Sequence, residues 1–246
     1  MIIHRQEGFS RMNLRASIFS PFANVHRLLV IFLVTAIISG ALLIFASEVM
    51  EGETLAFDRW ILLAMRSPDN LSVPAGPAWL RLAMTDLTAL GGYTVLTMIT
   101  GFATGYLIVV RKTVIAAGLA GSVISGLVIS SLLKLVYLRP RPDIVVHLVA
   151  VQSSSFPSGH ATNSAVTYLT LGIFLAGAEK NRWVRTYLMA VAIFLTVAVG
   201  VSRVYLGVHW PSDVLAGWCV GSLWAVLCSI LMAKLQGHPT VSPADE

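Results

Sequence analysis

The stretch Tyr187–Leu235 decides the architecture of this chain, and it reads YLMAVAIFLTVAVGV-SRVYLGVHWPSD-VLAGWCVGSLWAVLCSILMAKL. Two apolar runs, 187–201 and 214–235, flank a short polar segment, 202–213. The second run is long enough to cross a bilayer as a helix, which takes about 20 residues, and the first approaches that length. The pattern therefore predicts two membrane helices that are joined by polar residues at one membrane face.

The polar segment 202–213 holds three residues that suit chemistry on a phosphate. Pro211 fits the first turn of a helix, where a missing N–H costs nothing. His209 then precedes a helix and Asp213 lies about one turn along, so the carboxylate can accept a hydrogen bond from one ring nitrogen and leave the other as a nucleophile. Arg203 supplies a planar, charged fork that matches phosphate. An ordinary polar loop between two helices is the alternative, and the rest of the chain decides between them.

The composition is that of an integral membrane protein. Of 246 residues, 56% are hydrophobic and only 12% are charged, which is far from the usage of soluble domains. The net charge of +5 comes from basic residues that are dispersed among short loops. Without a dense basic stripe or a nucleic-acid motif, this charge does not predict a nucleic-acid partner.

Further apolar runs extend this pattern to an all-α polytopic membrane protein with six transmembrane helices. We expect a membrane domain over 28–236, a cytoplasmic N-terminal segment over 1–27 and a polar tail over 237–246. The four additional spans are expected at 28–46, 90–110, 114–133 and 161–177. Small residues in the third span, such as Gly126, suit close helix packing.

The connection 47–88 is long and carries more acidic than basic residues. Within it, 57–66 has the pattern of a short amphipathic helix, and 67–70 that of a turn. Such a helix at the membrane interface would cover or gate a site, or would simply pack as part of a loop. The sequence leaves both interpretations open.

The distribution of basic residues predicts the orientation. Six spans place both termini on one side, and most lysines and arginines outside the polar cluster fall on that side. By the positive-inside rule the termini are cytoplasmic.

The same parity brings three polar segments to the opposite face: 134–142, 157–160 and 202–213. A charged residue at a single helix end is often only an anchor at the interface, and Pro-Ser-Gly-His alone is typical of a helix-starting turn. Two histidines, several cations and a carboxylate on one face are not explained in that way. We therefore predict that the active site lies at this face.

This set of residues suits phosphoryl transfer, in which catalysis depends mainly on positioning and electrostatics. Lys134, Arg141 and Arg203 would clamp the phosphate oxygens. The N-terminus of the fourth span, at Ser158 and Gly159, is an anion site, and glycine allows close approach of the backbone. Since no Asp/Glu/His cluster suits a two-metal centre, the positive charge is expected from side chains.

Three motifs carry a family resemblance: Lys134-x6-Arg141-Pro142, Pro157-Ser158-Gly159-His160 and Ser202-Arg203-x5-His209-x3-Asp213. In these the chain resembles the type 2 phosphatidic-acid phosphatase superfamily. That family includes membrane lipid phosphate phosphatases, relatives that act on sugar phosphates, and soluble vanadate haloperoxidases. The motifs lie within 134–213, and the six-span layout extends the resemblance over most of the chain.

The resemblance implies a role for each matching residue. His209 would be the nucleophile and form a phosphohistidine, which Asp213 would orient and support. His160 would protonate the leaving oxygen and then activate water. No metal and no cofactor are implied, and Arg139, outside the motifs, has no implied role. The phosphate-binding residues would be Lys134, Arg141, Ser158, Gly159 and Arg203.

The resemblance also implies a lipid phosphate substrate that is reached from the bilayer. Undecaprenyl pyrophosphate is the first expectation, because similar bacterial proteins often act on it; phosphatidylglycerophosphate, phosphatidic acid and a lipid A phosphate are the alternatives. A bacterial inner membrane is expected, with the site on the periplasmic or extracellular face. A haloperoxidase is disfavoured because those relatives are soluble, whereas a non-catalytic lipid-phosphate-binding or flipping protein would keep the same pocket. The sequence does not indicate the oligomeric state.

Overall fold

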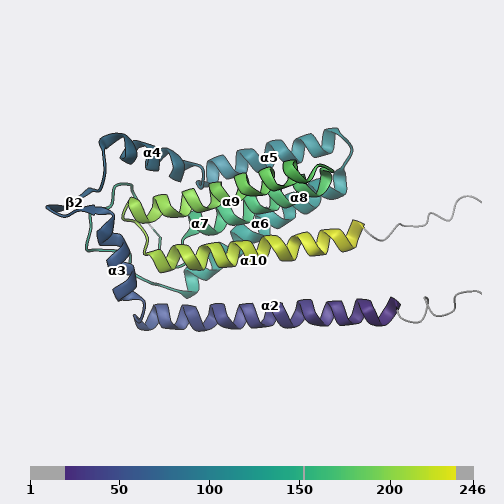
Figure 1. The fold of residues 1–246 in the computed structure, drawn as a ribbon, viewed down its shortest axis with the longest axis horizontal. Helices are drawn as coiled ribbons and strands as arrows, with labels where there is room; N and C mark the ends of the chain where they lie inside the picture. Colours follow the sequence, from purple (N-terminus) through teal and green to yellow (C-terminus); the bar gives the residue numbers. More distant parts are fainter. Residues whose placement is uncertain (1–19, 152, 237–246) are drawn as a thin grey trace, which may run out of the picture. The chain divides into compact units, whose positions relative to one another are not determined.

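A computed structural model describes residues 20–151 and 153–236 of the protein, and most of these are helical (Figure 1). The expected all-α class is thus confirmed. The chain divides into two units, Met1–Ile44 and Phe45–Glu246, and the site lies wholly in the second. The long helices are α2 (Ser20–Glu51), α5 (Tyr93–Val109), α6 (Thr113–Val136), α9 (Arg182–Tyr205) and α10 (Pro211–Gln236).

Six spans are present when one bent pair of helices is counted as a single span. Within the described residues, five helical segments are long and apolar enough to cross a membrane, the first of them Leu33–Glu51 of α2. The sixth consists of α4 (Ala78–Ala89) and α5, which meet at a bend of 50°. The six-helix membrane architecture is therefore as predicted. The segments 1–19 and 237–246, parts of the expected lead and tail, lie outside the described residues.

The predicted boundaries differ most at the first and fifth spans and in the connection before the second. Helix α2 begins at Ser20 and ends at Glu51, whereas the first span was expected at 28–46. Helix α9 is longer than 187–201, because Asn181 caps it with a 2.9 Å bond from the Trp183 N–H and the charged first turn continues into the apolar run. Helix α4 was not predicted, since its polar residues obscure the helical period. Pro211 begins α10 as expected.

The connection 47–88 contains the expected amphipathic helix, α3 (Leu55–Ala64). The expected turn after it closes a small hairpin of β1 (Arg66–Ser67) and β2 (Asn70–Pro74). Leu62 of α3 is fully buried with Trp210 and Val214. This apolar contact fixes α3 against the beginning of α10.

The fourth span is the most buried of the membrane helices and has a change of helical type within it. Helix α7 (Gly159–Ser164) leads through a π-helical turn, η1 (Ala165–Leu169), into α8 (Thr170–Ala178). Such turns are frequent near functional sites. Small residues permit close packing: a Cβ on Gly217 of α10 would lie 2.9 Å from the Ser158 carbonyl oxygen. Gly126 of α6 likewise faces Val166 at close range, as its small size predicted.

Candidate active site

The predicted helix ends meet in one place. This place is surrounded by the C-terminal ends of α6 and α9, the loop 137–158 and the N-terminal ends of α7 and α10. The backbone N–H of Ser158 donates to the carbonyl of Asp213 at 3.0 Å, and that of Ser155 donates to Arg139 at 2.9 Å. These bonds hold the three sequence motifs together.

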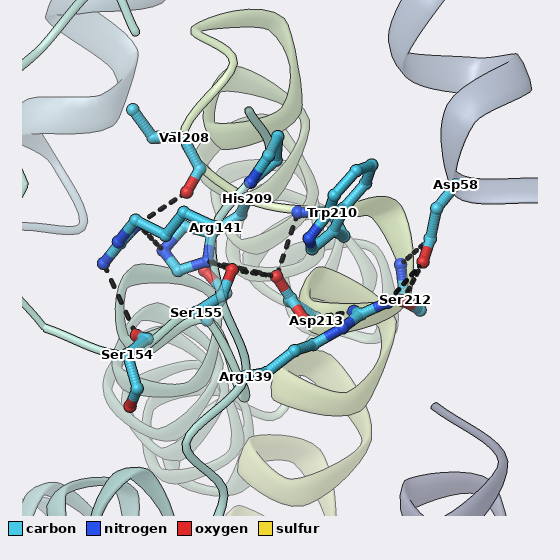
Figure 2. Close-up of polar contacts among 12 residues, drawn as sticks. Asp58, Arg139, Arg141, Ser154, Ser155, Val208, His209, Trp210, Ser212 and Asp213 are labelled. Carbon is cyan, nitrogen blue, oxygen red and sulfur yellow. Dashed lines mark hydrogen bonds and ion pairs between the residues drawn. The ribbon is translucent and has the colours of Figure 1, made fainter. Parts of the chain in front are cut away.

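His209 lies at the centre, with its two ring nitrogens in different surroundings (Figure 2). Nε2 is 3.2 Å from an Arg141 guanidinium nitrogen, and Nδ1 is 3.5 Å from Asp213 Oδ2. Because arginine only donates, Nε2 must accept and the ring proton must lie on Nδ1. Burial lowers the pKa of His209 to about 3, although Asp213 opposes this shift. The imidazole is therefore neutral near pH 7, with a lone pair on Nε2.

Asp213 is completely buried and is held from three directions. Its Oδ2 accepts hydrogen bonds from the Ser155 hydroxyl and, at 2.9 Å, from the Trp210 N–H. Its Oδ1 accepts from Arg139 at 2.6 Å. The bond to Trp210 has a local cause: Asp213 is the third residue of α10 and reaches back to the residue before the helix, as in a capping box. The carboxylate thus has one fixed orientation beneath His209.

Two cations of the first motif, Lys134 and Arg141, donate to backbone carbonyls around the site. Arg141 donates from Nε to the Ser153 carbonyl at 2.8 Å, and from Nη1 to the Val208 carbonyl at 2.5 Å. Lys134 donates to the Ser154 carbonyl at 2.8 Å. A Cβ on Gly159 would lie 3.1 Å from Lys134 Cε, so glycine lets the ammonium stem approach the start of α7.

Arg203 and Ser158 each keep an unused buried donor. In the described part of the chain, Arg203 Nε and Ser158 Oγ are buried without a hydrogen-bond partner. Arg203 is oriented by a 2.9 Å bond from Nη1 to the Thr88 hydroxyl. Buried polar groups normally find partners, and these two suit phosphate oxygens.

His160 lies against the end of α4. A Cβ on Gly91 would be 3.3 Å from both Cβ and Cδ2 of His160. The Gly91 N–H bonds the Thr88 carbonyl at 3.0 Å, so one turn of chain supports both His160 and Arg203. Every predicted site residue therefore lies at this end of the helices, whereas the predicted catalytic roles stay predictions.

Several residues of the site were not predicted. Asp58 of α3 and Arg139 form an ion pair of 2.8 Å beside Asp213; the signal was an acidic residue on the apolar face of an amphipathic helix. Arg66, also buried, donates to the Tyr205 carbonyl at 2.8 Å and so holds the chain before His209. No sequence pattern marked Thr88 or Ser155.

The side chains present do not form a metal centre. Within 20–151 and 153–236, no group of three or more His, Cys, Asp or Glu residues is placed to hold a metal ion. Asp213, which lies beside His209, and Asp58 are both engaged by Arg139. Metal independence of the reaction stays a prediction.

Comparisons with known proteins agree with the geometry. The family model of the PAP2 superfamily matches residues 115–236. Phosphatidylglycerophosphatase B of Bacillus subtilis is 36% identical over 59% of this chain and 71% of its own length. The undecaprenyl-diphosphatase BcrC of the same species is 37% identical over 45% of this chain and 53% of its own length.

Solved structures show the same fold. The crystal structure of a transmembrane PAP2 type phosphatidylglycerolphosphate phosphatase from Bacillus subtilis has a TM-score of 0.72 and 28% identity, and the match covers 83% of this chain and 98% of that one. Aquifex aeolicus LpxE has a TM-score of 0.51 and 26% identity, over 73% of this chain and 94% of that one. The chain therefore belongs to the PAP2 superfamily and is an integral membrane hydrolase of phosphate esters.

Proposed function

We propose that this protein removes the terminal phosphate of a membrane lipid phosphate or pyrophosphate through a phosphohistidine on His209. The observation that carries the proposal is the neutral, buried His209, whose Nε2 lone pair faces Arg141 while Nδ1 faces Asp213. Undecaprenyl pyrophosphate is the first substrate to test. Phosphatidylglycerophosphate is the second, because phosphatidylglycerophosphatase B of Bacillus subtilis, whose match covers 59% of this chain, is named for it.

In the first step, His209 Nε2 attacks phosphorus and the bond to the lipid oxygen breaks. Arg141 would exchange its hydrogen bond with Nε2 for the phosphate, joined there by Lys134 and the free donors of Arg203 and Ser158. Charge on the equatorial oxygens is thereby stabilised. The ring becomes cationic as the N–P bond forms, and Asp213 offsets that charge. His160 gives a proton to the departing oxygen.

In the second step, His160 takes a proton from water, whose oxygen attacks the phosphohistidine. The N–P bond breaks, inorganic phosphate leaves and His209 returns to its neutral form. Across both steps, one lipid phosphate and one water give one lipid product and one phosphate. A fixed anion such as Asp213 is suited to this cycle because the charge on His209 appears and disappears within it.

The proposed setting is a bacterial inner membrane with the site on the outer face. The spans and the membrane-embedded relatives support the membrane location. The excess of basic residues at the other face, including Arg111 and Lys112 before α6, supports the orientation.

Phosphate release by purified protein in detergent tests the function. We expect release from at least one of undecaprenyl pyrophosphate, phosphatidylglycerophosphate, phosphatidic acid and a lipid A phosphate, undiminished by chelator. His209→Ala is expected to reduce turnover to background, because no neighbouring group replaces the covalent step. Full turnover in His209→Ala would reject the phosphohistidine, and complete loss in chelator with rescue by magnesium would reject the metal-free site.

The same assay separates the enzyme from a non-catalytic protein with the same pocket. A lipid-phosphate-binding or flipping protein would release no phosphate from any of the four lipids. Folded wild-type protein that binds these lipids without releasing phosphate would establish that alternative.

A further inference from the structure

Arg139, a buried cation outside the family motifs, lies between two buried carboxylates (Figure 2). Its Nη1 is 2.6 Å from Asp213 Oδ1, and its Nη2 is 2.8 Å from Asp58 Oδ2. Arg139 is 5% exposed, and both aspartates are fully buried. One guanidinium thus bridges the carboxylate beneath His209 and a carboxylate from α3.

Both oxygens of the second carboxylate, that of Asp58, accept hydrogen bonds. Asp58 Oδ1 accepts from the Ser212 N–H at 2.8 Å, and Oδ2 accepts from the Ser212 hydroxyl at 2.6 Å and the Thr54 hydroxyl at 3.1 Å. The Ser212 hydroxyl also accepts from Arg139 at 2.8 Å. A buried charge is stable only when it is paired and hydrogen-bonded in this way.

The charges of Asp58, Arg139 and Asp213 together determine how much negative charge is available to support a cationic His209. If Arg139 faced Asp213 alone, the two charges would cancel, and little negative charge would remain to support a cationic His209. With Asp58 on its other side, Arg139 is neutralised by a second anion, and the group of three keeps one net negative charge. That charge lies next to Nδ1, where positive charge develops when phosphohistidine forms.

We propose that Asp58 and Arg139 are positioning residues of the active site: Arg139 fixes the orientation of Asp213, and Asp58 preserves the negative charge with which Asp213 supports His209. The proposal rests on the proposed function. It assigns to α3 a part in catalysis, since this helix brings Asp58 to the start of α10. We assign neither residue a contact with the substrate.

Asp58→Asn tests the electrostatic part with an almost isosteric change. We expect kcat to fall by roughly 10–100-fold, by analogy with the loss of a group that orients a metal ligand, with little change in KM because phosphate binding is untouched. The substrate is the lipid phosphate on which the wild type turns over fastest. Asp69→Asn is the matched control, because Asp69 is exposed in the β1–β2 turn, and we expect wild-type kcat.

The double variant Asp58→Asn/Arg139→Gln distinguishes charge from mere structural support. Removing both charges returns the full charge of Asp213 to His209, so the double variant should be faster than Asp58→Asn alone. A purely structural role predicts the opposite, because two changes in one buried network damage packing more than one. A double variant that is no faster than Asp58→Asn, or Asp58→Asn with wild-type kcat, overturns the proposal.

Folding and function are controlled separately. Rates are compared on monodisperse protein with measured melting temperatures. If Asp58→Asn does not fold, the double variant alone decides. The proposal then predicts that the kcat of the double variant is well above that of His209→Ala, and an equal kcat contradicts it. Turnover by the wild type and its loss in His209→Ala establish the proposed function independently. The role of Asp58 can therefore fail while the phosphatase function stands.

Discussion

At the residue scale, the difference between the two ring nitrogens of His209 is the basis of the proposed chemistry. Arg141 can only donate, so it selects the tautomer with a lone pair on Nε2. Asp213 and the Ser155 hydroxyl face the protonated Nδ1, at 3.5 and 3.4 Å. A buried, neutral imidazole is a nucleophile without first losing a proton.

The role of His160 depends on the leaving group, which gives a prediction at this scale. The alkoxide released from phosphatidic acid has a conjugate acid about as weak as water, with a pKa near 15.7. A lipid pyrophosphate instead releases a phosphate monoester, whose second pKa is about 6. We expect His160→Ala to slow hydrolysis of phosphatidic acid by about 10²–10⁴-fold, the usual worth of a general acid, and that of the pyrophosphate by a much smaller factor.

Both rates should come from one preparation under conditions where chemistry limits turnover. Any contribution of His160 to phosphate binding affects both substrates alike, so the ratio of the two defects is the informative quantity. Equal defects would assign His160 to binding and not to proton transfer.

Individual residues also show what a sequence can predict of such a site. His209, Asp213 and Arg141 were predicted because the chemistry requires their types and the motifs fix their spacing. Thr88 and Ser155 are common polar residues that act through their position in space, and nothing local marks them. Asp58 lies between these cases: its type and its place on the apolar face of a helix were visible, but its partner Arg139 is distant in the chain and only the fold joins them.

At the element scale, the break between α4 and α5 serves the site. The residues Leu90, Gly91 and Gly92 separate the two helices at a bend of 50°. The backbone there approaches His160 and Val199 so closely that a side chain has no space. The bend was not predicted, because hydropathy places this stretch at the beginning of a straight span; the glycine pair was the available signal.

Gly91→Ala tests this role of the break. The added methyl group would overlap Val199 and press on His160, and overpacking of this kind costs about 1–3 kcal/mol. We expect a lower melting temperature. We also expect kcat to fall more on phosphatidic acid than on a pyrophosphate, because the added methyl group displaces His160. Gly101→Ala in α5 is the control: its Cβ would meet no atom within 4 Å, and alanine favours helix by up to about 1 kcal/mol. Equal behaviour of the two variants would contradict this role.

At the scale of the whole molecule, six spans place the ends of α6 and α9 and the beginnings of α7 and α10 on one membrane face. This result was predictable from sequence, because the length of apolar runs and their parity determine which loops share a side. Which way that face points is a separate question that depends on the charges of the loops.

Labelling of single cysteines in intact cells tests the orientation. In a background where Cys219 and Cys228 are replaced by alanine, Ala150→Cys places a thiol in the exposed part of the loop beside the site, and Lys180→Cys places one in the exposed turn between α8 and α9. If the termini are cytoplasmic, an impermeant thiol reagent should label position 150 in intact cells whose outer membrane, where present, admits it. Position 180 should react only after lysis, which also shows that its thiol is reactive. Labelling of position 180 from outside, with position 150 protected until lysis, would place the active site on the cytoplasmic face and restrict its substrates to lipid phosphates of the inner leaflet.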